Sequence, residues 1–154
     1  MVGFRRLQAL LLNRLARWRH GVTLGVRAAV LDSDGRIFLV RHRYTPGWYF
    51  PGGGVDSRES AVAAVGREVM EEAGIRLDGP PDLFGLYVNR KLGSRDHVAL
   101  FVCRSWTAEA PPYPNLEIAE GGFFDRDALP KGVTEATLRR LAEILDRQPR
   151  SEEW

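Results

Sequence analysis

Three consecutive glycines lie at positions 52–54, shortly before a segment that is rich in alanine, valine and glutamate. Consecutive glycines cost too much backbone entropy for the interior of a strand or a helix, so they predict a tight loop. Because glycine has no Cβ, the backbone of such a loop can lie close to a ligand. A carbonyl of this loop is therefore available to a ligand that the following segment also holds.

The following segment, residues 61–73, contains no proline and one internal glycine, and this composition predicts a helix. Glu68, Glu71 and Glu72 have the spacing i, i+3, i+4, which places three carboxylates on one helix face. Like charges this close destabilise a helix unless a cation neutralises them. Hard oxygen donors favour Mg²⁺ or Mn²⁺ over zinc, whereas an isolated cluster of this kind is more often a solvated face.

Two neighbours of the cluster have roles of their own. Arg67 is adjacent to Glu68 and at i, i+4 from Glu71, so its guanidinium can hold both carboxylates through charge-assisted hydrogen bonds. Asp56 and Glu59 have the N-cap and N3 spacing of a capping box variant. For Glu59, starting the helix and binding a metal remain alternative roles.

The stretch from Gly53 to Ile75 matches the pattern G-x5-E-x7-R-E-U-x-E-E-x-G-U, in which U is aliphatic, and it resembles the signature of the Nudix hydrolase family. The matching residues are Gly53, Glu59, Arg67, Glu68, Val69, Glu71, Glu72, Gly74 and Ile75. The resemblance implies an α/β fold, an α/β/α sandwich with a central mixed curved sheet. It also implies Mg²⁺-dependent hydrolysis of a nucleoside diphosphate linked to another group.

Carried over residue by residue, the resemblance implies metal ligands and a general base. The implied ligands of Mg²⁺, or of Mn²⁺, are Glu68 and Glu72, with Glu71 and the Gly52 carbonyl in addition. Glu68 is also a candidate base, but several family members use a glutamate from a later loop. The two later candidates are Glu117, which we favour, and Glu120. The catalytic set that we predict is Glu68, Glu71, Glu72, Arg67 and Glu117.

The segment from Arg41 to Tyr49 leads into the glycine loop and offers both charge and aromatic rings. Arg41 and Arg43, which alternation places on one strand face, are candidates for pairing with phosphate, and Tyr44 and Trp48 for stacking on a base. Core packing under the loop is the alternative for Trp48. Residues 90–93 lack the proline and the tyrosine that family members acting on ADP-ribose and on dinucleoside polyphosphates carry in that window. The substrate class stays open among nucleoside triphosphates, nucleotide sugars and similar compounds.

The remaining segments predict a single domain at residues 21–148, followed by a tail at 149–154, because 154 residues with 44% apolar content suffice for one core. Residues 22–31 and 36–43 are expected strands around a hairpin turn at 32–35. Residues 83–89 and 97–106 are a second expected pair, the latter apolar enough for a central strand. Thr134 is the expected N-cap of a last helix, with Leu138, Leu141 and Leu145 on its buried stripe.

Residues 1–20 predict a basic amphipathic helix. Residues 1–31 hold six of the 22 basic residues and no acidic one, which leaves 16 basic against 20 acidic residues in the rest of the chain. The apolar stripe consists of Phe4, Leu7, Leu11, Leu15 and Trp18. Packing on the domain or on a second subunit is the default, and peripheral membrane contact and nucleic-acid binding are alternatives. The apolar run is too short to span a bilayer, so we expect a cytoplasmic protein. Its expected oligomeric state is a monomer or a homodimer.

Cysteine and histidine contribute little to the predicted site. Cys103 is the single cysteine and is expected in the core. Of His20, His42 and His97, we expect His97 to lie nearest to a cleft. Three function classes follow: a metal-dependent hydrolase of small nucleotides, which we favour; a nucleotide-binding sensor without turnover; and an RNA 5′-end pyrophosphohydrolase, for which the basic start of the chain would serve binding.

Overall fold

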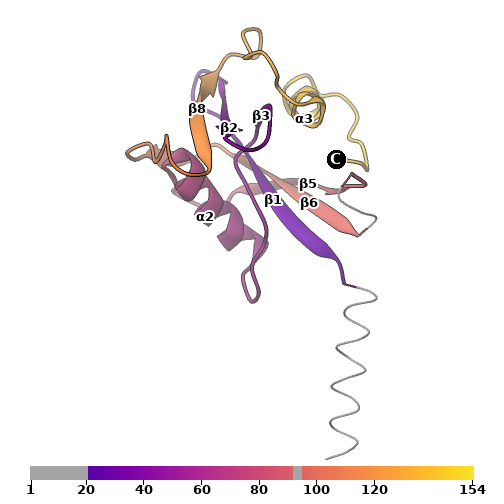
Figure 1. The fold of residues 1–154 in the computed structure, drawn as a ribbon. Coiled ribbons are helices and arrows are strands. Elements are labelled where there is room, and N and C mark those ends of the chain that lie inside the picture. The colour runs from indigo at the N-terminus through magenta and orange to yellow at the C-terminus, as the bar shows by residue number, and fades with distance from the viewer. Residues whose placement is uncertain (1–20, 92–94) are drawn as a thin grey trace, which may run out of the picture.

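The structure, a computed structural model, describes residues 21–91 and 95–154, which form eight strands and two helices (Figure 1). The helix expected at residues 1–20 lies outside the described residues. Within them, no helix combines the length and the hydropathy that a bilayer crossing requires.

The first sheet has the strand order β1-β6-β5 and is mixed. Strand β1 (Thr23–Val30) pairs in parallel with β6 (Asp96–Cys103), and β5 (Asp82–Val88) pairs antiparallel with the other edge of β6. Strand β6 is buried along most of its length, which confirms the expected central strand. The predicted pairing of residues 83–89 with 97–106 is confirmed too.

The second sheet has the order β3-β2-β8, all antiparallel. Its strands are β3 (Trp48–Tyr49), β2 (Ile37–His42) and β8 (Ile118–Phe124). A two-stranded ribbon of β4 (Ile75–Leu77) and β7 (Trp106–Ala108) completes the strands of the described residues.

The hairpin expected around residues 32–35 is confirmed for its turn but not for the pairing of its strands. The turn is present, with a hydrogen bond from the Gly35 amide to the Asp32 carbonyl and φ of +79° at Gly35. Strands β1 and β2, however, share only an isolated bridge between Leu31 and Ile37 and then join different sheets. Long-range partners, β6 for β1 and β8 for β2, decide the pairing, and local turn signals do not encode them.

Helix α2 (Ala61–Ala73) has the predicted bounds, and its N-cap is Ser60, whose hydroxyl accepts from the Ala63 amide at 3.1 Å. The capping box of Asp56 and Glu59, one of the two roles left open for Glu59, does not start the helix. Those residues form a separate turn, in which the Glu59 carboxylate accepts from the Asp56 amide at 3.0 Å. Gly74, at φ 64°, ends the helix in the left-handed conformation that glycine favours.

Helix α3 (Glu135–Leu145) begins at the predicted N-cap, Thr134. Its buried stripe contains Leu141 as expected, but Leu138 is 39% exposed. Two polar residues, Arg140 and Glu143, are buried in its place, because they form an ion pair with each other at 2.6 Å.

The core lies on both faces of the β1-β6-β5 sheet. Val26, Ala28 and Val30 of β1 pack in one cluster with Val65 and Val69 of α2. Ala29, which points to the other face, packs in a second cluster with Leu141 of α3. The two helices therefore cover opposite faces of the strands, and the α/β/α arrangement expected from the sequence is confirmed (Figure 1).

Candidate active site

The glycine loop runs beside β1 and is hydrogen-bonded to it. The Val26 amide donates to the Gly53 carbonyl at 2.8 Å, and the Ala28 amide donates to the Pro51 carbonyl at 2.9 Å. Gly52 has φ of +147°, and a Cβ at this position would lie 2.1 Å from the Val26 carbonyl oxygen. The close approach of loop and strand therefore requires glycine.

On the other side of the loop, helix α2 presents two of its glutamates to the glycines. The Glu72 side chain is buried and accepts a hydrogen bond from the Gly52 amide at 2.8 Å. Glu68 lies so close to Gly53 that a Cβ there would meet its Oε1 at 2.5 Å. Glu71 lies one helical turn after Glu68, and its side chain is 59% exposed.

Arg67 holds the neighbouring carboxylates in place. Its guanidinium donates to Glu59 at 3.0 Å, to Glu68 at 2.8 Å and to Glu71 at 3.3 Å, and it also donates to the Gly54 carbonyl at 3.1 Å. These bonds raise the pKa of Arg67 and, on Glu59, lower the pKa of the carboxyl group. Glu59 thus joins the site through Arg67.

A second arginine, Arg27 of β1, holds the loop backbone. Its guanidinium donates to the Gly52 carbonyl, the group expected as a backbone metal ligand. Burial lowers the pKa of Arg27, while the nearby Glu72 and Glu68 carboxylates act in the opposite direction. Arg27 thereby places a positive charge behind the acidic cluster.

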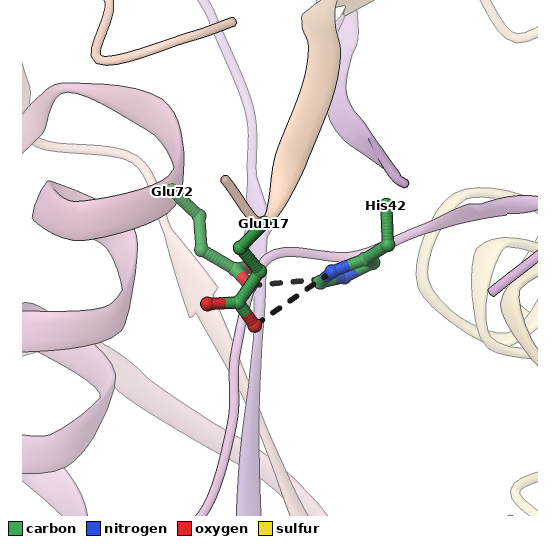
Figure 2. Close-up of side chains that lie close together, drawn as sticks. All are labelled: His42, Glu72 and Glu117. Atoms are coloured by element: carbon green, nitrogen blue, oxygen red, sulfur yellow. Dashed lines mark ion pairs between the residues drawn. The ribbon is translucent and has the colours of Figure 1, made fainter. Parts of the chain in front are cut away.

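Two further side chains reach Glu72 from other segments. His42 ends β2, and its Nε2 lies 3.7 Å from Glu72 Oε1 while its Nδ1 lies 3.9 Å from Glu117 Oε1 (Figure 2). Among residues 21–91 and 95–154, these three form the group whose ligand atoms all lie within 4.8 Å of one another. Glu117 precedes β8, and its carbonyl accepts from the Arg43 amide at 2.8 Å, which ties its loop to the end of β2.

Burial dominates the electrostatics of the cluster. Desolvation raises the pKa of Glu72 to about 7 and raises that of Glu68 as well. Burial, with the charge of Arg27, lowers the pKa of His42, so the imidazole is neutral at pH 7 and leaves the carboxylates without its charge. A cation that reaches a buried carboxylate with a raised pKa stabilises its ionised form.

A cavity of about 320 Å³ opens beside these groups. Its polar lining comes from Glu68, Glu71 and Glu72 of α2 and from Glu117, with residues 115, 116 and 118 completing the wall. Carboxylates from two segments far apart in the chain thus face one space, which suits a hard divalent cation and an anionic substrate bound to it.

The substrate-binding residues expected from the segment before the loop are dispersed. Trp48 is 8% exposed and packs at 5.0 Å from the Phe124 ring, so it is part of the core and is not available for stacking. Arg41 forms an ion pair with Glu120 at 2.8 Å. Glu120, the second candidate base, therefore has its partner outside the cavity. Arg43 donates to the Asn115 carbonyl, and Tyr44 is 83% exposed.

Two residues of the site were missed at the sequence level. His42, not His97, is the histidine at the cluster, and the pairing of β2 with β8 has a register shift directly before it, between Arg41 and His42. Arg27 lies in an apolar strand with no motif around it. A lone arginine within an apolar predicted strand is a signal, since a buried guanidinium requires a partner.

The comparisons with known proteins agree with this geometry. A family model described as the NUDIX domain matches residues 21–145. A MutT-like protein of Streptomyces ambofaciens is 27% identical over 80% of this chain and 77% of its own length. An RNA pyrophosphohydrolase of Halorhodospira halophila is 35% identical over 46% of this chain and 38% of its own length. The crystal structure of a MutT NUDIX hydrolase from Burkholderia pseudomallei superposes with a TM-score of 0.68 at 30% identity, over 79% of this chain and 97% of that one.

Fold and site thus define a hydrolase of phosphorus-containing acid anhydrides, with its carboxylates on the helix that follows a glycine loop. The chain belongs to the Nudix family, and its enzyme class is that of the pyrophosphate-bond hydrolases.

Proposed function

We propose that this protein is a Mg²⁺-dependent pyrophosphohydrolase that cleaves the diphosphate linkage of a nucleoside diphosphate joined to another group. The observation that carries the proposal is the meeting of Glu72 with Glu117, a residue of a distant loop, at the edge of one cavity. Mn²⁺ fits the same donors.

The donor set suits a hard cation. Glu68, Glu72 and Glu117 offer carboxylate oxygens, and Glu71 offers another at the exposed edge of the cavity. Glu72 is 4% exposed, and burial raises its pKa even though the charge of Arg27 acts in the opposite direction, so a further cation would stabilise the buried carboxylate. The Gly52 carbonyl would join the set by sharing its lone pairs between Arg27 and the metal. When bound, Mg²⁺ polarises the phosphate oxygens and makes a coordinated water easier to deprotonate.

The protein's own groups supply position and a base. Arg67 fixes Glu68 and Glu71 in their rotamers, and the Gly52 amide fixes Glu72. Glu117 is the residue we assign as base, because its carboxylate is 72% exposed at the cavity and so can reach a water molecule there. His42, in contact with both Glu72 and Glu117, positions them relative to each other. Glu68 is the alternative base.

The test is phosphate release, coupled to pyrophosphatase or phosphatase as needed, across nucleoside triphosphates, nucleotide sugars, dinucleotides and 5′-triphosphorylated RNA, with and without Mg²⁺. We expect hydrolysis that requires Mg²⁺ and falls by orders of magnitude in Glu72→Gln, which keeps the hydrogen bond from Gly52 through its amide oxygen. Glu109→Gln is the matched control, since Glu109 pairs with Arg76 away from the cavity.

Each alternative predicts a different result in the same panel. Nucleotide binding without turnover of any substrate would favour the sensor function. Turnover restricted to 5′-triphosphorylated RNA would favour the RNA pyrophosphohydrolase function, which similarity to the Halorhodospira halophila protein supports. A Glu72→Gln variant as active as the wild type would contradict the assignment of this cluster as the catalytic centre.

A further inference from the structure

The segment after α3 lies along the free edge of β5. The Arg150 guanidinium donates to the Phe84 carbonyl at 2.6 Å and lies 4.1 Å above the Phe84 ring. The Val88 amide then donates to the Glu152 carbonyl, and the Trp154 amide donates to the Val88 carbonyl, both at 2.9 Å. Residues 152–154 therefore form an isolated parallel bridge with Val88 at the edge of the sheet, where the chain ends in Figure 1.

Buried polar groups of α3 fix the path of this segment. Arg140, fully buried, donates to the Glu153 carbonyl at 2.7 Å and to the Glu143 carboxylate at 2.6 Å. Glu143 also accepts from the Ser151 amide and from the Tyr87 hydroxyl, each at 2.9 Å. A buried ion pair contributes little net stability, but its hydrogen bonds are specific in direction. The network thus holds residues 151–153 in one conformation.

This conformation brings Trp154 to the wall of a second cavity. The Trp154 ring lies 5.6 Å from the Tyr87 ring and 5.7 Å from Arg140 Cζ, and it lines a cavity of about 270 Å³. Gly25, Arg27 and Gly53 line the same cavity. Because Glu68 lies against Gly53 from the α2 side, this residue of the glycine loop borders both the second cavity and the carboxylates.

The polar groups of the second cavity select the chemistry of a ligand. Asp96 lines it, and its carboxylate accepts from the Thr23 hydroxyl at 2.7 Å and from the Asn89 side-chain amide at 3.0 Å. A fixed carboxylate repels phosphate and accepts from N–H donors. An indole ring favours a flat partner that it can stack on. Together, Asp96 and Trp154 suit a nucleobase that carries N–H groups.

We propose that Trp154 is a specificity-determining residue: its ring stacks on the base of the substrate, while Asp96 accepts a hydrogen bond from that base. The diphosphate then extends past the glycine loop to reach Glu68 and Glu72. Arg27, which lines the second cavity and donates to the Gly52 carbonyl, lies where the diphosphate passes the loop. This proposal rests on the hydrolase function proposed above, and it assigns to residues 150–154 the role of carrying one wall of the substrate site.

The test measures equilibrium binding of AMP, GMP, CMP and UMP by calorimetry without Mg²⁺, together with kcat and KM for the substrates that the panel identifies. We expect the wild type to bind at least one monophosphate. Trp154→Ala should weaken that binding about tenfold and raise KM by a similar factor, with kcat changed less than about twofold. Trp154→Phe keeps an aromatic ring, so its Kd for the monophosphate and its KM should stay within about threefold of the wild-type values.

The controls separate a role in binding from a role in folding. Leu86→Ala removes an exposed apolar side chain from β5, outside the cavity, and should change neither binding nor KM. Asp96→Asn removes the charge, keeps the size, and should alter the preference among the four bases. Should Trp154→Ala fail to fold, Trp154→Phe and Asp96→Asn still test the site.

The outcomes also separate the two proposals. A wild type that hydrolyses its substrate, with KM and base preference unchanged in Trp154→Ala, would overturn the role of Trp154 alone. Base-dependent binding that Trp154→Ala weakens, without hydrolysis of any substrate, would support the cavity and contradict the hydrolase function. Binding of none of the four monophosphates to the wild type would overturn the role of the cavity.

Discussion

At Gly52, a single missing Cβ lets the loop lie against β1. The backbone has φ of +147°, a region that residues with a side chain rarely adopt, and the Val26 carbonyl fills the space where a Cβ would lie. The same residue donates its amide to Glu72 and accepts from Arg27 through its carbonyl. The geometry of the acidic cluster therefore depends on this glycine.

We expect Gly52→Ala to lower the free energy of unfolding by about 2 kcal/mol or more, because the loop must leave β1 to relieve the contact. Chemical denaturation followed by circular dichroism measures the loss. Gly54→Ala is the matched control, since a Cβ at Gly54 meets no atom within 4 Å. An equal loss in both variants would contradict the special role of Gly52.

The glutamates of the cluster differ in burial, which their spacing in the sequence did not indicate. The sequence placed Glu68, Glu71 and Glu72 on one helix face, which is correct, but burial separates them: Glu72 is buried, whereas the Glu71 side chain is mostly exposed. Exposure depends on how α2 lies against the glycine loop, and helical periodicity carries no information about that contact.

Helix α2 is the element that the sequence predicted best. Its bounds, 61–73, follow from local composition and from Gly74, which ends it. Its N-cap is Ser60, whereas the sequence had pointed to Asp56 and Glu59 as one possible start of the helix. Glu59 instead forms an ion pair with Arg67, and its carboxylate accepts from the Asp56 amide.

We expect Ser60→Ala to destabilise the protein by about 1 kcal/mol, since the Ala63 amide loses its acceptor. Ser57→Ala, three residues earlier in the exposed turn, is the control and should change stability by less than about 0.5 kcal/mol. Urea denaturation at pH 7 measures both. A loss of stability in Ser60→Ala no larger than that in Ser57→Ala would contradict the assignment of Ser60 as the N-cap.

At the scale of the whole molecule, a bound cation should couple the site to global stability. Binding to the folded state alone stabilises it by about 2.7 kcal/mol at a concentration one hundred times Kd, which raises the Tm of a protein of this size by roughly 5–10 °C. We expect Mg²⁺ to raise the Tm of the wild type in this way at pH 8. Differential scanning fluorimetry with and without EDTA measures the shift.

Two comparisons sharpen this prediction. Glu72→Gln should lose most of the shift. The wild type should show a smaller shift at pH 5 than at pH 8, because burial raises the pKa of Glu72 to about 7 and Mg²⁺ must then displace a proton. A shift that is independent of pH and of Glu72 would place the cation elsewhere.

The sequence by itself determined the chemistry of this protein, because the chemistry depends on residues close together in the chain. The glycine loop, the helix at 61–73 and the carboxylates on one of its faces all follow from local backbone preferences and from the 3.6-residue period. The family could be assigned from the same stretch, and one apolar strand in the middle of the sheet from its composition.

The tertiary structure decided which distant groups complete the site. His42, Glu117 and Arg27 join the cluster because β2 pairs with β8 and β1 lies beside the loop, and these contacts span long stretches of the chain. Trp154 reaches the second cavity through the backbone bonds of its segment with Val88 and through the buried bonds of Arg140 and Glu143. Long-range pairing is set by the packing of the whole core, so no local pattern in the sequence specifies it.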